Sequence, residues 1–271
     1  SIRRQRQMCI RDRSQTASKS FYEGLFTFDK DMKVIDALAT DYKVSDDGLV
    51  YTVTLRKGVK FHDGSEFQAD AVKANFDRVT NKANGLKRYM LYQNIEKTEV
   101  VDPYTVRFTL KKPFSSFINQ LAHPASVMIC PSTLANKTNK KIAFEPCGTG
   151  PYTLDKYNPS EGMRVVKNPN YWQAGFPKLD AINWKPVVEN STRVAMLLTG
   201  EAQFAFPLPA EQVKQVQGKD QVRLDITPSI ILRYVEMNMS KKPFQDKRVR
   251  EAFNYAINKD CLLYTSPSPR D

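Results

Sequence analysis

Side chains suited to catalysis are few in this sequence, since only two histidines occur among 271 residues. His62 is followed directly by Asp63, a pair that a catalytic triad would combine with a nucleophile. No nucleophile-elbow, phosphate-loop or zinc-protease motif accompanies the pair. The segment 148–150 (GTG) lacks the rest of a dinucleotide-binding fingerprint and precedes a predicted strand rather than a helix. The sequence therefore predicts no catalytic residue, and places His62 and Asp63 in a loop.

Cysteines offer a second kind of chemistry, and two of the four, Cys130 and Cys147, lie in the body of the chain. Two thiols are too few for a structural zinc site, which takes four ligands, so the sequence predicts no metal and no cofactor. Each cysteine stands beside a proline, and a predicted helix separates the two. An oxidising compartment would favour a disulfide, and a reducing one would favour two buried thiols. The residues leave both possibilities open.

The two ends of the chain are related through the DNA sequences that would encode them, and not through their amino acids. Residues 7–12 (QMCIRD) and 261–266 (CLLYTS) back-translate into reverse complements over almost their whole length. This short DNA sequence resembles the transposon end used to build sequencing libraries. We therefore interpret residues 1–13 and 261–271 as adapter-derived scars and expect the chain to be a piece of a longer protein. A genuine basic arm would explain the N-terminal arginines but not the matching tail.

Charge and hydropathy exclude several classes of protein. The formal net charge is +12 and stays basic without the scars, but the lysines are scattered. A dispersed basic surface suits solubility and the attraction of anionic ligands. No zinc-finger spacing or RNA-binding signature points to nucleic acid, and no apolar run approaches the roughly 18 residues of a membrane span. The length suits one large domain or two ordinary ones.

Hydrophobic periodicity predicts an α/β chain with mixed sheets. Two hairpins are expected, over residues 42–55 with a turn at 46–48 and over residues 96–110 with a turn at 102–103. Helices are expected over residues 14–26, with Phe21 and Leu25 on one face, 71–79, 113–121, 131–137, 191–200, 210–217 and 246–260. Further strands are expected over residues 126–129, 147–157, 163–168, 182–187, 203–208, 222–228 and 231–239.

Residues 42–78 (YKVSDDGLVYTVTLRKGVKFHDGSEFQADAVKANFDR) resemble the hallmark segment of the peptide-type extracytoplasmic solute-binding proteins, family 5. These are the receptors of ATP-driven (ABC) importers for dipeptides, oligopeptides, nickel and glutathione. Further landmarks follow in order: PCGTGPYTL, NPNYW, STRVAMLLTGEAQFAF and PFQDKRVREAFNYAINKD. The segments LKRYMLYQNI, INQLAHPA and TGEAQFAFPLP resemble the glutathione-receptor branch. The cysteine pair is a departure, because we expect other residues there in that branch.

The resemblance implies a two-lobed periplasmic binding protein fold, type II-like and of the peptide-receptor cluster, with a hinge and a cleft. Residues 14–245 would form most of lobe one, and residues 246–260 would begin lobe two. The resemblance also implies an exported, periplasmic monomer whose signal peptide is absent from this sequence. Its partners would be a small peptide ligand and the permease subunits of an inner-membrane importer.

The resemblance further implies which segments face the cleft. Glutathione carries two carboxylates and one ammonium, so a site for it should offer arginine forks to the carboxylates. Arg88 and Arg233 are the candidates for this role. Their expected polar neighbours are Gln15, Tyr89, His123 and Ser229. A solvated or structural role is the alternative for each of these side chains.

Three functions compete on this evidence. The first is a receptor that captures glutathione or a similar small peptide. The second is a dipeptide, oligopeptide, haem or nickel-chelate receptor of the same family. The third, from another class, is a peptidase-like enzyme on this fold, against which the lack of a triad or metal cluster argues. The identity of the ligand stays open, because receptors of this family have key ligand-binding residues in the half of the protein that we expect to be missing.

Overall fold

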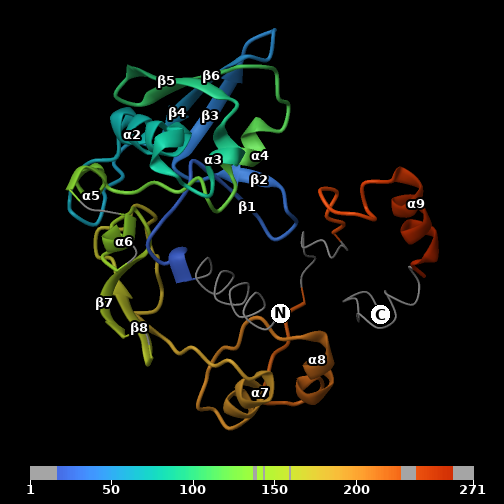
Figure 1. Ribbon diagram of the computed structural model, residues 1–271. Coiled ribbons are helices and arrows are strands. Elements are labelled where there is room, and N and C mark those ends of the chain that lie inside the picture. The colour runs from blue at the N-terminus through green and yellow to red at the C-terminus, as the bar shows by residue number, and fades with distance from the viewer. Residues whose placement is uncertain (1–16, 137–138, 143, 159, 227–235, 259–271) are drawn as a thin grey trace. The chain divides into compact units, whose positions relative to one another are not determined.

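The structure is a computed structural model that describes residues 17–136, 139–142, 144–158, 160–226 and 236–258 (Figure 1). The chain divides into two compact units, Ser1–Pro186 and Val187–Asp271. We call them the larger and the smaller unit and describe each by itself. The lobe boundary predicted at residue 245 concerns a complete receptor and stays a prediction.

A four-stranded sheet forms the centre of the larger unit. Its strands are β3 (Ala39–Val44), β4 (Val50–Leu55), β5 (Ile95–Asp102) and β6 (Thr105–Leu110), in the order β3-β4-β6-β5. All neighbouring pairs are antiparallel, which confirms both predicted hairpins. Strand β4 alternates as predicted, since Tyr51, Val53 and Leu55 are buried.

Helix α2 (Ala69–Thr80) lies beside this sheet in Figure 1. The helix predicted over residues 71–79 from the helical spacing of its apolar residues is confirmed, and two of these, Val72 and Phe76, are buried. The ring of Phe76 meets the rings of Tyr92 and Phe108 edge-on, with centroids 5.8 and 4.9 Å apart. Such aromatic contacts add to the free energy of burial, so this cluster ties helix α2 firmly to the sheet.

Two smaller sheets complete the larger unit. One pairs β1 (Phe26–Phe28) with β2 (Val34–Asp36), and the other joins β7 (Tyr152–Asn158), β8 (Gly162–Lys167) and β9 (Ala181–Trp184). Every described strand pair is antiparallel, whereas the sequence suggested mixed sheets. Four of these pairs, β1–β2, β3–β4, β5–β6 and β7–β8, are consecutive strands of the chain that return beside each other, which makes them antiparallel.

The remaining helices are short. The larger unit contains η1 (Lys82–Asn84), α3 (Tyr89–Tyr92), α4 (Phe117–Leu121), α5 (Pro131–Asn136) and α6 (Asn139–Ile142). The smaller unit contains α7 (Asn190–Leu198), α8 (Ala210–Val216) and α9 (Lys247–Ala256). Gly200, with φ of 77°, follows the end of α7, and Asp246 caps α9 by accepting from the Arg248 N–H. None of the described helices is long and apolar enough to span a membrane.

The helix predicted over residues 14–26 is wrong in its described part. Helical geometry stops at Ser18, and the chain then becomes extended before strand β1. The carbonyls of Ser20 and Phe21 accept hydrogen bonds from the N–H groups of Tyr152 and Gly150, both at 2.9 Å. These partners are far away in the sequence, and they replace the bonds that a helix would have made. The predicted helical face is therefore split between two core clusters.

Three predicted strands also fail within the described residues. Segment 126–129 forms only a single bridge, between Val127 and Gly24, because its other N–H groups bind side chains and loop carbonyls. Residues 203–208 and 222–226 have no strand partner in the described part of the smaller unit. An alternating pattern alone does not make a strand when no neighbouring backbone pairs with it. Of the strand predicted over residues 231–239, residues 231–235 lie outside the described residues, and residues 236–239 are not in a strand.

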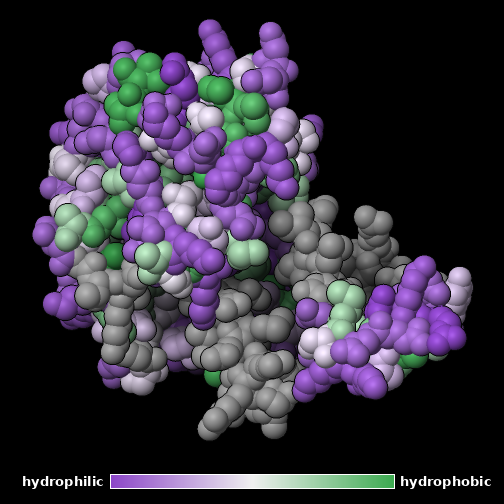
Figure 2. All heavy atoms as spheres, turned by 45° about the horizontal axis from the view of Figure 1, so that its top comes forward, coloured by the Kyte–Doolittle hydropathy of each residue, from purple (hydrophilic) through white to green (hydrophobic). Residues whose placement is uncertain are grey.

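The surface is mainly hydrophilic. Figure 2 shows polar residues over most of the visible face, interrupted by small separate apolar patches. The exposed large hydrophobic residues of the four-stranded sheet are Tyr42, Val44, Val100 and Val101. Single exposed hydrophobic residues are normal on a soluble surface, so this sheet suggests no binding site by itself.

Candidate functional site

Helix α3 and the loop after helix α4 are held together by two hydroxyl groups. The Tyr92 hydroxyl lies 2.5 Å from the Ser126 hydroxyl, and both residues are buried. The Ser126 hydroxyl donates to the Gln120 carbonyl at 2.7 Å, so Tyr92 must be the donor to Ser126. This chain of bonds fixes residues 88–92 against residues 123–126, two of the segments expected to face the cleft.

The ring of His123 lies in this loop as a hydrogen-bond acceptor. Its Nδ1 accepts from the Ala125 N–H at 3.0 Å, so the neutral ring carries its proton on Nε2. Burial lowers the pKa of His123, and the positive charge of Arg88 lowers it further. The ring is therefore neutral near pH 7, with an Nε2–H that has no partner among the described residues.

Arg88 is the cationic residue of this region, which consists of residues 88–92 and 123–126 and is called the α3 corner. It is half-buried at the start of helix α3, and its charge acts on both His123 and Tyr92. The structure thus brings two predicted site residues, Arg88 and His123, into one neighbourhood. Tyr89 is half-buried next to Arg88 in the chain. The other three predicted residues, Gln15, Ser229 and Arg233, lie outside the described residues.

An open pocket of about 170 Å³ adjoins this corner between helix α2 and segment 125–129. Three cationic residues line it, Arg78, Lys87 and Arg88. The other lining residues are Asn75, Phe76, Val79, Leu86, Tyr92, Ala125, Ser126, Val127, Met128 and Ile129. Sequence reasoning missed Arg78 and Asn75, because polar residues on an amphipathic helix resemble a solvated face.

Glu23 connects two of the family's landmark segments, and the sequence analysis did not single it out. Its carboxylate accepts from the Thr149 hydroxyl at 2.9 Å, the Tyr171 hydroxyl at 2.7 Å and the Trp172 Nε1–H at 3.0 Å. The Arg56 guanidinium lies 4.5 Å from the centroid of the Trp172 ring. Burial raises the pKa of Glu23 in spite of these bonds. The GTGPY and NPNYW segments are thereby fixed to one carboxylate, which explains them as packing motifs.

His62 has a comparable structural role. Its Nδ1 faces the Gly148 N–H at 3.4 Å, and its Nε2 lies 3.0 Å from the Gly150 carbonyl. Burial lowers the pKa of His62, so the neutral ring can accept at Nδ1 and donate at Nε2. Both ring nitrogens bind backbone groups, which leaves neither available as a catalytic base.

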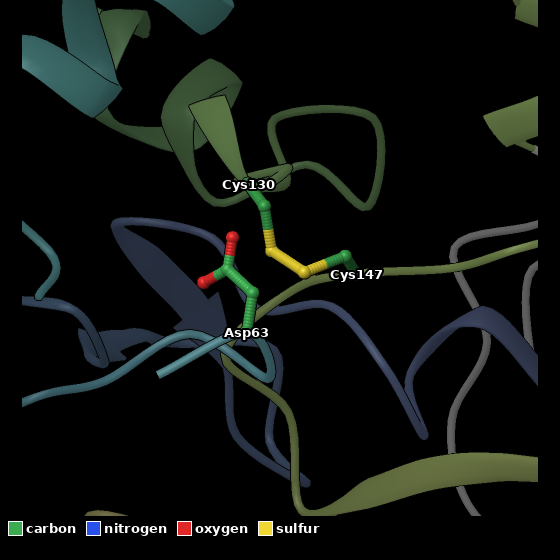
Figure 3. A group of neighbouring side chains, drawn as sticks. All are labelled: Asp63, Cys130 and Cys147. Atoms are coloured by element: carbon green, nitrogen blue, oxygen red, sulfur yellow. A yellow bond between two sulfur atoms is a disulfide. The ribbon is translucent and has the colours of Figure 1, made fainter. Parts of the chain in front are cut away.

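Cys130 and Cys147 form a disulfide in the structure, with Cα atoms 5.5 Å apart (Figure 3). The bond joins the start of helix α5 to the segment that leads into strand β7. A backbone hydrogen bond from the Cys130 N–H to the Cys147 carbonyl, at 3.0 Å, accompanies it. The separation falls within the range that disulfides require.

Asp63 lies beside this disulfide, and the three side chains could suggest a metal site. Its carboxylate already accepts from the Ser132 hydroxyl at 2.5 Å and from the Ser65 hydroxyl at 2.5 Å. Burial opposes the charged form, but these hydrogen bonds outweigh burial and lower the pKa of Asp63. Sulfur atoms bonded to each other carry no thiolate charge for a metal, so the group is explained as a disulfide beside a satisfied carboxylate.

Solved structures show the class of protein to which this fold belongs. DppA from Helicobacter pylori, in complex with peptide STSA, matches with a TM-score of 0.76 and 30% identity, over 92% of this chain and 53% of that one. NikZ from Campylobacter jejuni, in complex with Ni(L-His), matches with a TM-score of 0.74 and 27% identity, over 90% of this chain and 49% of that one.

Sequence comparison gives the family. Residues 33–265 match the bacterial extracellular solute-binding proteins, family 5 Middle. The glutathione-binding protein GsiB of Salmonella typhimurium is 58% identical over 250 residues, which are 92% of this chain and 49% of that protein. GsiB of Pectobacterium atrosepticum is 57% identical over the same length. The chain belongs to the family 5 solute-binding proteins, and it spans about half the length of the curated relatives that it matches.

Proposed function

We propose that this chain is part of a receptor that captures glutathione, or a similar small peptide, in the periplasm. The receptor is a monomer that delivers its solute to the permease of an ABC importer. The observation that carries the proposal is the 58% identity over 250 residues with a protein named for glutathione binding. Periplasmic binding proteins among the structural matches support the compartment.

The side chains of the α3 corner, around Arg88, are chemically suited to a ligand that carries carboxylates. Glutathione has two carboxylates, and a carboxylate that loses water needs a cationic or hydrogen-bonding partner. Arg88 is such a cation, and the Nε2–H of His123, which has no partner among the described residues, is a neutral donor in the same neighbourhood. Arg233, Gln15 and Ser229 remain proposed ligand contacts, although they lie outside the described residues.

Two other functions are weighed against this one. Structures of family members hold dipeptide and nickel–histidine ligands, so those solutes are the alternatives within the family. A peptidase would need an available base and nucleophile, but in the described part of the chain both nitrogens of His62 bind backbone groups. The cation-lined corner favours an anionic solute over a neutral or cationic one.

The test is a chimera in which this chain replaces the matching 250 residues of the Salmonella typhimurium protein. Calorimetric titration with glutathione, a neutral dipeptide and nickel–histidine gives the ligand preference. We expect tight binding of glutathione alone and no hydrolysis of it. A folded chimera that prefers the dipeptide or the nickel complex overturns the glutathione assignment, and release of amino acids from glutathione overturns the receptor assignment.

A further inference from the structure

The two cysteines of the disulfide differ in their exposure to solvent. Cys130 is fully buried in the core of the larger unit, whereas Cys147 is only partly buried against that core. A thiolate that opens a disulfide attacks one sulfur atom, and the other sulfur leaves with the negative charge. Attack from solvent is therefore open at Cys147 and closed at Cys130, so Cys130 is the sulfur that leaves.

The departing sulfur would become charged close to an acidic side chain. One oxygen of the Asp63 carboxylate lies within 4.8 Å of both sulfur atoms, and Figure 3 shows the carboxylate beside the bond. Although burial opposes the charged form, hydrogen bonds from Ser132 and Ser65 lower the pKa of Asp63, so the carboxylate is charged near pH 7. Hydroxyl and N–H groups bind it, and no ion pair of Asp63 occurs among the described residues.

Two effects therefore oppose a thiolate at Cys130. Burial removes the water that stabilises a negative charge on sulfur. The charge of Asp63 repels a second negative charge at this short distance. A disulfide exchanges slowly when its leaving thiolate is unstable. Burial has this effect on any disulfide in a core, whereas the neighbouring carboxylate is a particular feature of this one.

We propose that Cys147 is the site at which a small thiol forms a mixed disulfide with this chain, and that the charge of Asp63 slows the reaction. The attacking thiolate forms a bond to the Cys147 sulfur, the S–S bond breaks, and Cys130 leaves as a thiolate that takes a proton from water. A second thiolate then attacks the sulfur of the bound thiol and releases Cys147. The protein disulfide is reduced, and two small thiols are oxidised to a disulfide.

The inference goes beyond the proposed function and does not rest on it. Any small thiol can carry out the exchange, whichever solute the receptor takes. Glutathione is itself a thiol, however, so a receptor that captures it would repeatedly expose its own disulfide to attack. A carboxylate beside the leaving sulfur would then keep the bond closed in the presence of the solute.

Other bonds hold the same segments in place when the disulfide opens. The Cys130 N–H still donates to the Cys147 carbonyl at 3.0 Å. The ring of His62 still contacts the Gly148 N–H and the Gly150 carbonyl. Because these contacts do not involve sulfur, we expect the exchange to take place in the folded protein.

The experiment uses the 271-residue chain with the substitutions Cys9→Ala and Cys261→Ala, which leave Cys130 and Cys147 as its only cysteines. The oxidised protein is treated with 2-mercaptoethanol at constant pH and salt. Samples taken early are quenched in acid, which stops exchange, and digested with pepsin without reduction. We expect mass spectrometry to find the 2-mercaptoethanol adduct on Cys147 and none on Cys130.

Asp63→Asn tests the role of the charge. The Asn oxygen can still accept from Ser65, and its amide can donate to the Ser132 oxygen, so the hydrogen bonds are kept. We expect the disulfide of this variant to open faster than that of the parent by about threefold or more. Asp47→Asn is the matched control, since Asp47 also accepts from a serine hydroxyl and a backbone N–H, in the turn between β3 and β4.

Ser132→Ala separates the charge from a loosening of the structure. It removes the hydrogen bond between helix α5 and Asp63 but keeps the carboxylate, so we expect the parent rate. An adduct on Cys130, or none on Cys147, overturns the inference. Equal rates for Asp63→Asn and Asp47→Asn overturn it as well, and so does equal acceleration by Ser132→Ala and Asp63→Asn. These outcomes are independent of the glutathione titration of the chimera, because 2-mercaptoethanol carries none of the carboxylates of that solute.

Discussion

The indole N–H of Trp172 donates a hydrogen bond to the Glu23 carboxylate at 3.0 Å, across 149 residues of sequence. Thr149 and Tyr171 donate to the same carboxylate. One acidic side chain near the start of the described chain thus holds two later segments in place. Three hydrogen bonds explain why the charge is tolerated there, although burial raises the pKa of Glu23.

Replacing Glu23 with Gln should preserve this junction. The Gln oxygen can accept from Trp172 and Thr149, and its NH₂ can donate to the Tyr171 oxygen. Because the folded-state pKa of Glu23 is raised, its contribution to stability is complete below the unfolded pKa. That contribution is lost as the pH rises through the folded pKa. We therefore expect Glu23→Gln to equal or exceed the parent in stability at pH 7, with a smaller advantage at lower pH.

Urea unfolding at several pH values measures this difference. Glu23→Ala is the control, because it leaves one buried donor, Thr149, and two partly buried donors, Tyr171 and Trp172, without an acceptor and should cost about 3 kcal/mol. A Gln variant that loses as much stability as the Ala variant at pH 7 would show that the negative charge itself is required.

Gly148 and Gly150 are predicted to be intolerant of any side chain. A Cβ at Gly148 would lie 2.2 Å from the Phe21 carbonyl oxygen, and a Cβ at Gly150 would lie 2.5 Å from the Phe21 carbonyl carbon. Both contacts are with backbone, which cannot move aside easily. We expect each Gly→Ala variant to lose about 3 kcal/mol. Gly64→Ala, which meets open space at a positive φ, should cost only about 1 kcal/mol in the same thermal unfolding series.

The local parts of this fold were predictable from sequence, and the long-range parts were not. Both hairpins and helix α2 followed from periodicity and turn residues, since their contacts lie close in the chain. The helix expected at residues 14–26 failed because Ser20 and Phe21 bind partners near residue 150. No local pattern reports such a partner.

The candidate site divides in the same way. The family resemblance pointed to the segments of Arg88 and His123, which the structure places in one neighbourhood. Nothing in the sequence singled out Arg78, because it lies on a helix face that resembles a solvated one. Glu23 was overlooked for a related reason: a lone acidic residue shows its three donors only after folding.

The Cys130–Cys147 pair should be found as a disulfide in exported protein. Peptide mapping without reduction is expected to show one cross-linked peptide that contains both residues. The bond closes a loop of 17 residues, so the double variant Cys130→Ala/Cys147→Ala should lose about 3 kcal/mol by the chain-entropy estimate. Cys9→Ala/Cys261→Ala is the control and should unfold like the parent. Four free thiols in freshly exported protein would contradict the prediction.

Arg88 and Arg233 should each contribute to glutathione binding in the chimera. Arg88→Ala or Arg233→Ala is expected to weaken binding by about 2 kcal/mol, the scale of a lost charged hydrogen bond. Lysine should recover only part of the loss, because it cannot form a planar fork. Arg107→Ala, on the exposed side of strand β6, should leave affinity unchanged. If both cleft variants bind as tightly as the parent in calorimetry at fixed salt, the site assignment is wrong.

His123 should make glutathione binding depend on pH. In the free chain, burial and the charge of Arg88 lower the pKa of His123. A carboxylate bound beside the ring would raise that pKa, because it favours the imidazolium. A group whose pKa rises on binding takes up a proton, so affinity should increase as the pH falls through the bound-state pKa. The increase should level off below the free-state pKa, and a rise of one unit limits it to about tenfold.

Calorimetry between about pH 5 and pH 8, on the parent and on a variant of His123, tests this effect, since unperturbed carboxylates titrate below that window, and arginine and tyrosine titrate above it. His123→Gln is the informative variant, because its amide N–H can replace the Nε2–H donor without titrating. We expect the variant to bind glutathione with nearly the parent affinity at pH 8 and to lose most of the gain at pH 5. If the parent shows no gain on acidification, or the variant keeps it, then His123 does not face the bound carboxylate.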